Sequence, residues 1–531
     1  MQRSTAAPPR ATLTRASSTP LLFTITFLAA LLRLHGISAD GLSSDEAFSW
    51  RMVGYPWGEL LHRAAGDVHP PLYYLLLKPW LGLVGDTPLA LRGLSVVFGV
   101  LVVPLVYALV REGQRLSRRA TEGDDAGMWP ALFAALLVAL HPAQIMASQN
   151  ARMYTLSAAL IALATTLLLR AIRTGRGWWA YGLAAAATCA THYYGFFSVA
   201  AQVAGAALFV YRVDPAKDAP SAASLARGFT VAGLVAALLY GAWLPAFVGQ
   251  VVRVSANYWI PAVSWLRVST AFASWASGLE REALGGAAVW IAVLTVLATL
   301  AATWRADRVS LFVLVQAAVP WLLGLAISIA TPRSIFLPRY LVPAQVFLLI
   351  FWAGRALAAR IIWLRVGLVA SLVGLSVLWL VRAKAQVPGE PLAEIRAADF
   401  LAQRYQGGDV VLTDSPRASN RLRYYLAQRG VRSPVMHCLL APSAEDVGHF
   451  AHTASLAPDE LILPRVLDSA DWRRLWWGTP TSVEQRLPST RWQQVVIRHF
   501  SAGGTHYMLT RYVPASQPAP GSAAGSAQDV D

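Results

Sequence analysis

The sequence predicts an all-α polytopic membrane protein that carries a small α/β domain near its C-terminal end. Hydrophobic residues make up 56% of the 531 residues, charged residues only 14%, and the mean hydropathy is +0.45. A soluble domain carries about 25% charged residues, so this composition excludes an ordinary soluble protein. The apolar residues also cluster in runs of about 20, the length of a helix that crosses a bilayer. Because the runs are continuous rather than alternating, they favour helices over the strands of a barrel.

We expect about eleven spans, and the first runs from about residue 20 to residue 37. Arg33 and His35 near its outer end are typical of snorkelling side chains, so we expect an uncleaved first helix. The other spans are expected near residues 89–110, 129–147, 153–170, 177–191, 195–211, 228–248, 284–303, 309–329, 341–355 and 362–381.

The basic residues follow the loops on one side of this predicted topology. With the N-terminus inside, every second loop is rich in arginine, as the positive-inside rule requires; Arg111, Arg115, Arg170 and Arg173 are examples. The formal charge of +16 is therefore explained by topology, and we expect no nucleic-acid partner. The predicted location is the cytoplasmic (inner) membrane, crossed many times. An odd number of spans places the C-terminal domain on the extracytoplasmic side.

Composition divides the chain into a cytoplasmic tail (1–19), a transmembrane domain (20–386), an extracytoplasmic α/β domain (387–514) and a disordered tail (515–531). In the α/β domain, helices are expected in "PLAEIRAADFLAQRY" and in "ASNRLRYYLAQRG". Strands are expected in "DVVLTD", "ELILP", "WQQVVIRHF" and "HYMLTRY". Two long outer loops, near 38–87 and 250–285, have the aromatic, proline and arginine content of helices that lie in the interface plane.

Two adjacent carboxylates, Asp45 and Glu46, follow the first span in the stretch "SSDEAFSW". Hydroxyls and acids are favoured in the first turn of a helix, so helix capping alone explains the pattern. Unpaired carboxylates next to a membrane span also cost free energy, and for this reason they usually have a function. Both interpretations can hold together, and they make this pair the first candidate site.

The stretch "GDVHPPLYYLLLKPW" is the second candidate. The two prolines fix the backbone and keep His69 extended, so Asp67 and His69 are expected to alternate along it and to face one cavity. Lys78 and the aromatic residues of this stretch suit an interfacial belt as well as a site.

Three further outer turns carry Arg or His next to Tyr. They are "SQNARMYTL" with Arg152 and Tyr154, "THYYG" with His192 and Tyr193, and "FLPRYLVP" with Arg339 and Tyr340. A snorkelling anchor is the ordinary explanation of a single arginine at such a depth. The recurrence at one membrane face favours an anionic lipid headgroup, because arginine binds phosphate through several fixed donors.

The order of these motifs resembles the bacterial members of glycosyltransferase family 39, relatives of the protein O-mannosyltransferases and the lipid A aminoarabinose transferases. "DEAFSW", "GDVHPPL", "ARMY" and "FLPRYLVPAQ" carry the resemblance, which covers roughly residues 20 to 345. It implies a GT-C membrane fold and transfer of a sugar from a polyprenyl-phosphate donor to a glycan, lipid or protein acceptor outside the membrane. It also implies that Asp45 is the catalytic carboxylate. His69 departs from the aminoarabinose transferases, which have Lys there, so the acceptor stays open.

The expected chemistry agrees with the resemblance. One carboxylate suffices as the base for the acceptor hydroxyl, because the lipid phosphate is a good leaving group and needs no proton from a second acid. Arg152 or Arg339 would stabilise the negative charge of the leaving phosphate. A single displacement predicts inversion at the anomeric carbon. Glu46 is expected either to orient Asp45 or to contact the acceptor. No Asp-x-Asp pair lies in the predicted site, so we expect neither a metal nor another cofactor; His449 and His452 lack further donors beyond His437 and Cys438.

Two alternatives remain. A transporter or flippase of a lipid-linked sugar would keep ionisable residues in the middle of its spans, whereas here they gather at one face. A scaffold or sensor that presents the C-terminal domain explains that domain, but it leaves the acidic loop without a role.

Overall fold

The computed structural model describes the chain with several gaps. The described residues are 18–39, 41–117, 128–210, 221–256, 260, 262–277, 285–304, 306–331, 334–363, parts of 365–377, 393–406, 409–413, 416–431, 435–439, 461–462, 474–480, 492–502 and 505–514. The predicted N-terminal tail up to residue 17, the pair His449 and His452, and the predicted tail from residue 515 onwards lie outside these residues.

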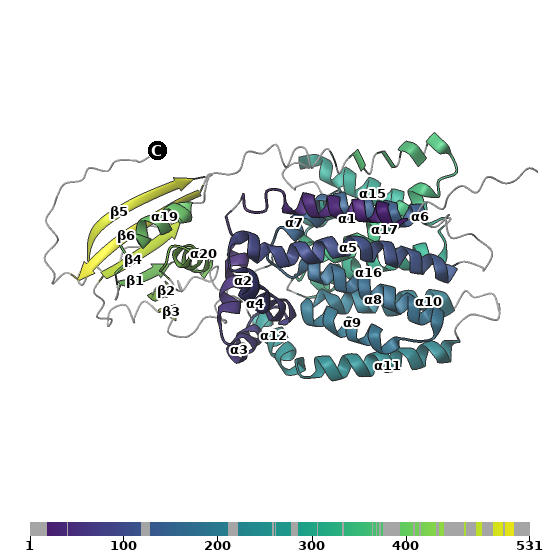
Figure 1. Cartoon of the computed structure of the whole chain (residues 1–531), viewed down its shortest axis with the longest axis horizontal. Coiled ribbons are helices and arrows are strands. Elements are labelled where there is room, and N and C mark those ends of the chain that lie inside the picture. Colours follow the sequence, from purple (N-terminus) through teal and green to yellow (C-terminus); the bar gives the residue numbers. More distant parts are fainter. Residues whose placement is uncertain are drawn as a thin grey trace, which may run out of the picture.

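Helices aligned side by side form the larger part of the molecule (Figure 1). A helix lies at ten of the eleven predicted spans, and the predicted span at 362–381 falls largely outside the described residues. Five described helices are long and apolar enough to cross a bilayer, or six if the bent pair α6–α7 counts as one. The polytopic helical class is confirmed, and the number of spans stays a prediction. The helices are α1 (Ser18–Leu34), α5 (Pro88–Ser117), α6 (Met128–Leu140), α7 (Pro142–Ser148), α8 (Tyr154–Thr174), α9 (Trp178–Thr191), α10 (Tyr194–Val210), α11 (Ala222–Gly241), α12 (Leu244–Ala256), α13 (Trp265–Ser277), α15 (Ala288–Thr303), α16 (Arg308–Ala330) and α17 (Val342–Leu357).

Arg33 does not snorkel, and that expectation is wrong. Its side chain is fully buried and donates to the carbonyl oxygens of Ala139 at 3.1 Å and Val138 at 3.2 Å. These carbonyls stand at the C-terminal end of α6, where the bend to α7 removes their helical partners. A guanidinium satisfies them and suits the negative end of the helix dipole. Arg33 therefore holds the break between α6 and α7.

Three short helices fill the first long loop, as expected, at one end of the helical bundle (Figure 1). They are α2 (Ser44–Gly54), α3 (Trp57–Gly66) and α4 (Leu72–Val84). Proline precedes α3 and α4, where its fixed φ suits a helix start. α3 buries Leu60 and Ala64 and exposes Trp57 and Leu61, so it is amphipathic.

The C-terminal region forms a six-stranded sheet with the order β3-β2-β1-β4-β6-β5. β1 pairs with β2 and β4 in parallel, whereas β6 pairs with β4 and β5 antiparallel. Four of the strands match predicted segments. The sequence pattern does not predict β2 and β4, because their runs are short or bounded by charges and turn residues. The elements are β1 (Asp409–Thr413), β2 (Val435–Leu439), β3 (Leu461–Ile462), β4 (Arg474–Pro480), β5 (Trp492–Ala502) and β6 (Thr505–Pro514), with helices α19 (Ala393–Ala402) and α20 (Pro416–Ala427).

Candidate active site

The start of α2 is a capping box. The Ser43 hydroxyl accepts from the Glu46 amide at 3.3 Å, and Glu46 Oε2 accepts from the Ser43 amide at 2.9 Å. These bonds satisfy two amides that a helix start leaves without partners. The acid pair therefore does form a helix N-terminus, and the backbone of Asp45 is fixed within its first turn.

Glu46 is buried in an ion pair with Arg92 of α5. Its carboxylate accepts from Arg92 Nε at 2.7 Å and from Nη2 at 2.9 Å, and also from the Ala151 amide at 3.1 Å. Arg92 in turn donates to the carbonyl oxygens of Ile37 at 2.5 Å and Gly41 at 3.1 Å. Glu46 thus joins the loop before α2, the helix α5 and the loop before α8. Every oxygen of its carboxylate is engaged within the protein.

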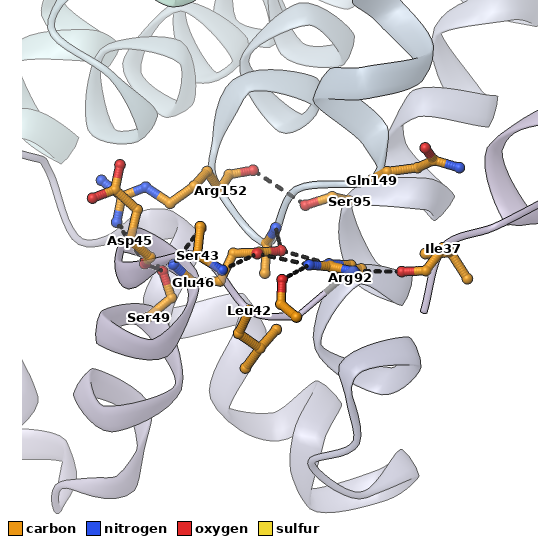
Figure 2. A network of polar contacts seen from close by, with 12 residues as sticks. Ile37, Leu42, Ser43, Asp45, Glu46, Ser49, Arg92, Ser95, Gln149 and Arg152 are labelled. Carbon is orange, nitrogen blue, oxygen red and sulfur yellow. Dashed lines mark hydrogen bonds and ion pairs between the residues drawn. The ribbon is translucent and has the colours of Figure 1, made fainter. Parts of the chain in front are cut away.

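Asp45 points the other way, and Figure 2 shows the two neighbouring carboxylates directed to opposite sides of the network. The Asp45 side chain is 26% exposed, and its Oδ2 lies 3.3 Å from Nη1 of Arg339. The Arg339 side chain is 43% exposed. Asp45 and Arg339 therefore form an ion pair that a substrate can reach.

Arg152 lies beside Asp45 and is buried. Its Nη1 donates to Ser49 Oγ at 3.3 Å, to Tyr74 Oη at 3.2 Å and to the Asp45 carbonyl at 3.5 Å. Its own carbonyl accepts from Ser95 Oγ at 3.1 Å. The Nε of Arg152 has no hydrogen-bond partner among the described residues. The site thus holds one fixed guanidinium from Arg152 and one accessible guanidinium from Arg339.

Asp67 and His69 lie together, as their expected alternation requires. Asp67 Oδ2 is 3.7 Å from His69 Nδ1 and accepts from the Tyr74 hydroxyl at 3.3 Å. His69 Nδ1 is also 3.4 Å from Nη2 of Arg152. The second motif therefore contacts the third through a chain that runs from Asp67 through His69 to Arg152.

A group of aromatic rings adjoins His69. His192 lies with its ring centroid 4.6 Å from that of Tyr340 and 5.5 Å from that of His69. Tyr154 lies 6.2 Å from His192 and 6.5 Å from Tyr340. Burial lowers the pKa of both histidines, and the neighbouring Arg152 charge acts in the same direction, although Asp67 opposes it at His69. Both imidazoles are therefore neutral near pH 7.

Two predicted site residues lie elsewhere. Lys78 donates to the carbonyl oxygens of Val53 at 2.8 Å and Tyr55 at 2.7 Å, so it completes the C-terminal end of α2. The Tyr193 hydroxyl donates to Gln250 of α12, and its ring packs on Phe247. The other nine predicted residues lie in one site. Hydrogen bonds and ion pairs connect them through Asp45, Glu46, Arg152 and His69, and the remaining members join through contacts between their aromatic rings.

Three contributors are not predicted from the sequence, namely Ser49, Arg92 and Ser95. Tyr74 is predicted only as one of the aromatic residues of the second candidate stretch, which suit a belt as well as a site. Of these residues, Arg92 is the one that the sequence could have indicated, because an arginine at the edge of an apolar span needs a charged or polar partner. The serines carry no distinguishing pattern, since their role depends on which side chains the fold brings near them.

The arrangement suits base catalysis next to an anion. A partly exposed carboxylate accepts a proton, and the adjacent guanidiniums stabilise negative charge on a leaving group. Among the described residues, no group of three or more His, Cys, Asp or Glu side chains has the arrangement that holds a metal ion.

Comparison with solved structures identifies the fold. ArnT from Cupriavidus metallidurans in the apo state matches with a TM-score of 0.59 at 13% identity, over 93% of this chain and 98% of ArnT. ArnT bound to undecaprenyl phosphate gives a TM-score of 0.57 with the same identity and coverage. The oligosaccharyltransferase AglB from Archaeoglobus fulgidus, in complex with an inhibitory peptide and a dolichol-phosphate, gives 0.45 at 12% identity, over 87% of this chain and 69% of AglB. No family model and no curated protein sequence matches. The likeness to ArnT over nearly the whole of both chains confirms the predicted GT-C fold.

Proposed function

We propose that this protein is an integral-membrane glycosyltransferase. It takes a sugar from a polyprenyl-phosphate carrier and transfers it to a hydroxyl of a glycan, lipid or protein acceptor. One observation carries the proposal: the partly exposed Asp45 carboxylate lies 3.3 Å from the Arg339 guanidinium, with buried Arg152 beside it. The fold shared with ArnT, which has been crystallised with undecaprenyl phosphate, supports a lipid-linked donor.

In the proposed reaction, Asp45 takes the proton from the acceptor hydroxyl. The acceptor oxygen attacks the anomeric carbon, and the bond from that carbon to the phosphate oxygen breaks with its electron pair on the phosphate. The leaving phosphate needs no proton, so a second acid is not required. One displacement inverts the anomeric configuration.

The two arginines have different proposed roles. Arg339 is exposed enough to exchange its contact with Asp45 for the donor phosphate. Arg152 is held by several acceptors, so it supplies fixed positive charge beneath the phosphate without moving. When Arg339 turns to the phosphate, Asp45 keeps the Arg152 charge beside it but loses the contact with Arg339, which makes it a stronger base.

Glu46 was expected either to orient Asp45 or to contact the acceptor, and its contacts support the first role. Its carboxylate is occupied by Arg92, Ser43 and Ala151, which leaves no oxygen directed to a substrate. Lys78 is occupied at the end of α2, so we assign it no role in donor binding.

The position of the site at one end of the bundle supports transfer at a membrane surface (Figure 1). We propose that this surface is the extracytoplasmic face of the cytoplasmic membrane, because the arginine-rich loops lie at the alternate ends of the predicted spans.

The experiment incubates purified protein in lipid with a panel of radiolabelled polyprenyl-phosphate sugars, with wild type beside Asp45→Asn. We expect the wild type to consume a donor, and Asp45→Asn to lose about 10²–10⁴-fold in rate while it inserts normally. Near-normal transfer by Asp45→Asn would refute the base assignment. Movement of intact donor across vesicles without consumption would favour the transporter alternative.

A further inference from the structure

The helix that carries Asp45 is packed between two different parts of the molecule. Phe48, Met52 and Val53 of α2 pack in one apolar cluster with Tyr74 and Leu77 of α4. On its other side, Ala47 is fully buried in a cluster with Leu422, Tyr424 and Leu426 of α20. Figure 1 shows the sheet and α20 standing against this end of the helical bundle. The surface of α2 is therefore completed by the C-terminal region.

Polar contacts from α20 fix both ends of α2. The Tyr425 hydroxyl accepts from the Leu42 amide at 2.7 Å, one residue before the capping serine. At the other end, Arg51 Nη1 donates to Asn420 Oδ1 at 3.3 Å. The Tyr425 contact is buried and lies three residues from Asp45 in the chain.

A third contact ties the same helices to the loop between α4 and α5. Trp50 of α2 packs edge-on against Tyr424 at 5.2 Å between ring centroids, and its Nε1 donates to Asp86 Oδ2 at 3.0 Å. Tyr424 donates its hydroxyl to the Asp86 carbonyl at 3.1 Å. Asp86 thus closes a ring of contacts between α2, α20 and the transmembrane part.

The segment before α2 is held from two sides. Arg92 of α5 donates to the Gly41 carbonyl, and Tyr425 of α20 accepts from the next amide. A catalytic group must be kept within about 0.5 Å of its working position. Loss of either anchor would allow the start of α2 to shift with the carboxylate on it.

We propose that α20 is a positioning element of the active site, which holds α2, and with it Asp45, in the orientation needed for proton transfer. The C-terminal region therefore contributes to turnover through Tyr425 and Asn420, neither of which needs to touch a substrate. This inference rests on the proposed function where it concerns turnover. The mechanical contact with α2 is independent of it.

The test uses two tyrosine-to-phenylalanine variants of the full chain in lipid. Tyr425→Phe removes the contact with Leu42, whereas Tyr405→Phe removes a bond to the Asp409 carbonyl at 3.1 Å, inside the C-terminal region. Hydrogen exchange of peptides covering residues 41–54 is measured first, and kcat and KM for the donor follow. We expect Tyr425→Phe alone to raise the exchange and to lower kcat about tenfold, with the KM changed less than about twofold. Asn420→Ala should act in the same direction from the other end of α2.

The outcomes separate this inference from the proposed function. If exchange near Asp45 stays at the wild-type level in Tyr425→Phe, the positioning contact is refuted, whatever the activity. If exchange rises and kcat does not change, α20 holds α2 but does not serve catalysis, and the proposal also fails. If exchange rises while the wild type consumes no donor, the mechanical contact stands and the proposed function fails.

Discussion

The carboxylate of Asp45 lies 3.3 Å from the guanidinium of Arg339, although 294 positions separate them in the sequence. Both side chains are partly exposed, which distinguishes this pair from the buried pair of Glu46 and Arg92. An accessible pair can open when an anion arrives, whereas a buried pair is part of the structure.

The first prediction concerns Arg339. We expect Arg339→Gln to raise the donor KM about tenfold or more, because a charge-assisted contact with phosphate is lost. Arg339→Lys should recover part of the affinity, since the charge remains without the bidentate geometry. Steady-state kinetics with the labelled donor test this. Arg308→Gln is the control, because Arg308 stands at the start of α16 outside the site. A donor KM that is unchanged in Arg339→Gln would exclude phosphate binding by this residue.

The second prediction compares two neighbouring acid-to-amide substitutions. Glu46→Gln leaves the Arg92 guanidinium buried without its counter-ion, so we expect a loss of about 3–5 kcal/mol in the free energy of unfolding. Asp45→Asn should lose less than about 1 kcal/mol, because its pair is partly exposed. Thermal unfolding in one detergent compares the two proteins. Equal losses would contradict the different roles assigned to the two carboxylates.

Much of this site was predictable from local patterns. The spacing from Ser43 to Glu46 predicts the capping box, and the alternation of Asp67 and His69 predicts that their side chains lie together. These features depend on residues that are close in the sequence. The turns with Arg152, His192 and Arg339 were expected at one face because the spans alternate in direction.

The remaining features depend on tertiary contacts. Glu46 meets Arg92 because the fold brings the start of α2 beside the start of α5, and no spacing in the sequence records this. Arg33 resembles a snorkelling residue until the bend between α6 and α7 supplies free carbonyl oxygens beside it. Tyr193 adjoins the predicted His192, but its ring turns to α12 instead.

The third prediction concerns pH. Burial lowers the pKa of His69 and His192 from the ordinary value of 6.5, so the unfolded chain binds protons first as the pH falls. Stability is therefore expected to decrease as the pH drops below 6.5 towards the lowered values. The melting temperature between pH 7.5 and pH 5 measures this (roughly the range in which histidine titrates).

A matched pair of variants assigns that pH dependence. His69→Asn should make the melting temperature fall less steeply with decreasing pH, because one of the buried imidazoles is removed. His62→Asn should leave it unchanged, since His62 is exposed on α3. A slope that is the same in all three proteins would show that other groups cause the loss.

The last prediction tests the support that Arg33 gives to the break between α6 and α7. A Cβ at Gly99 would lie 2.1 Å from Ser148 Oγ, which accepts from Arg33 Nε at 3.1 Å. Gly99→Ala must therefore displace Ser148 and disturb Arg33. We expect the free energy of unfolding to fall by about 1–3 kcal/mol. Gly233→Ala is the control, because a Cβ at this helical glycine meets open space and should stabilise α11 by about 0.5–1 kcal/mol. In thermal unfolding, Ser148→Gly should remove most of the cost of Gly99→Ala if the clash is its cause. If the losses of Gly99→Ala and Ser148→Gly instead add up in the double variant, the destabilisation by Gly99→Ala comes from the backbone of α5 and not from the clash.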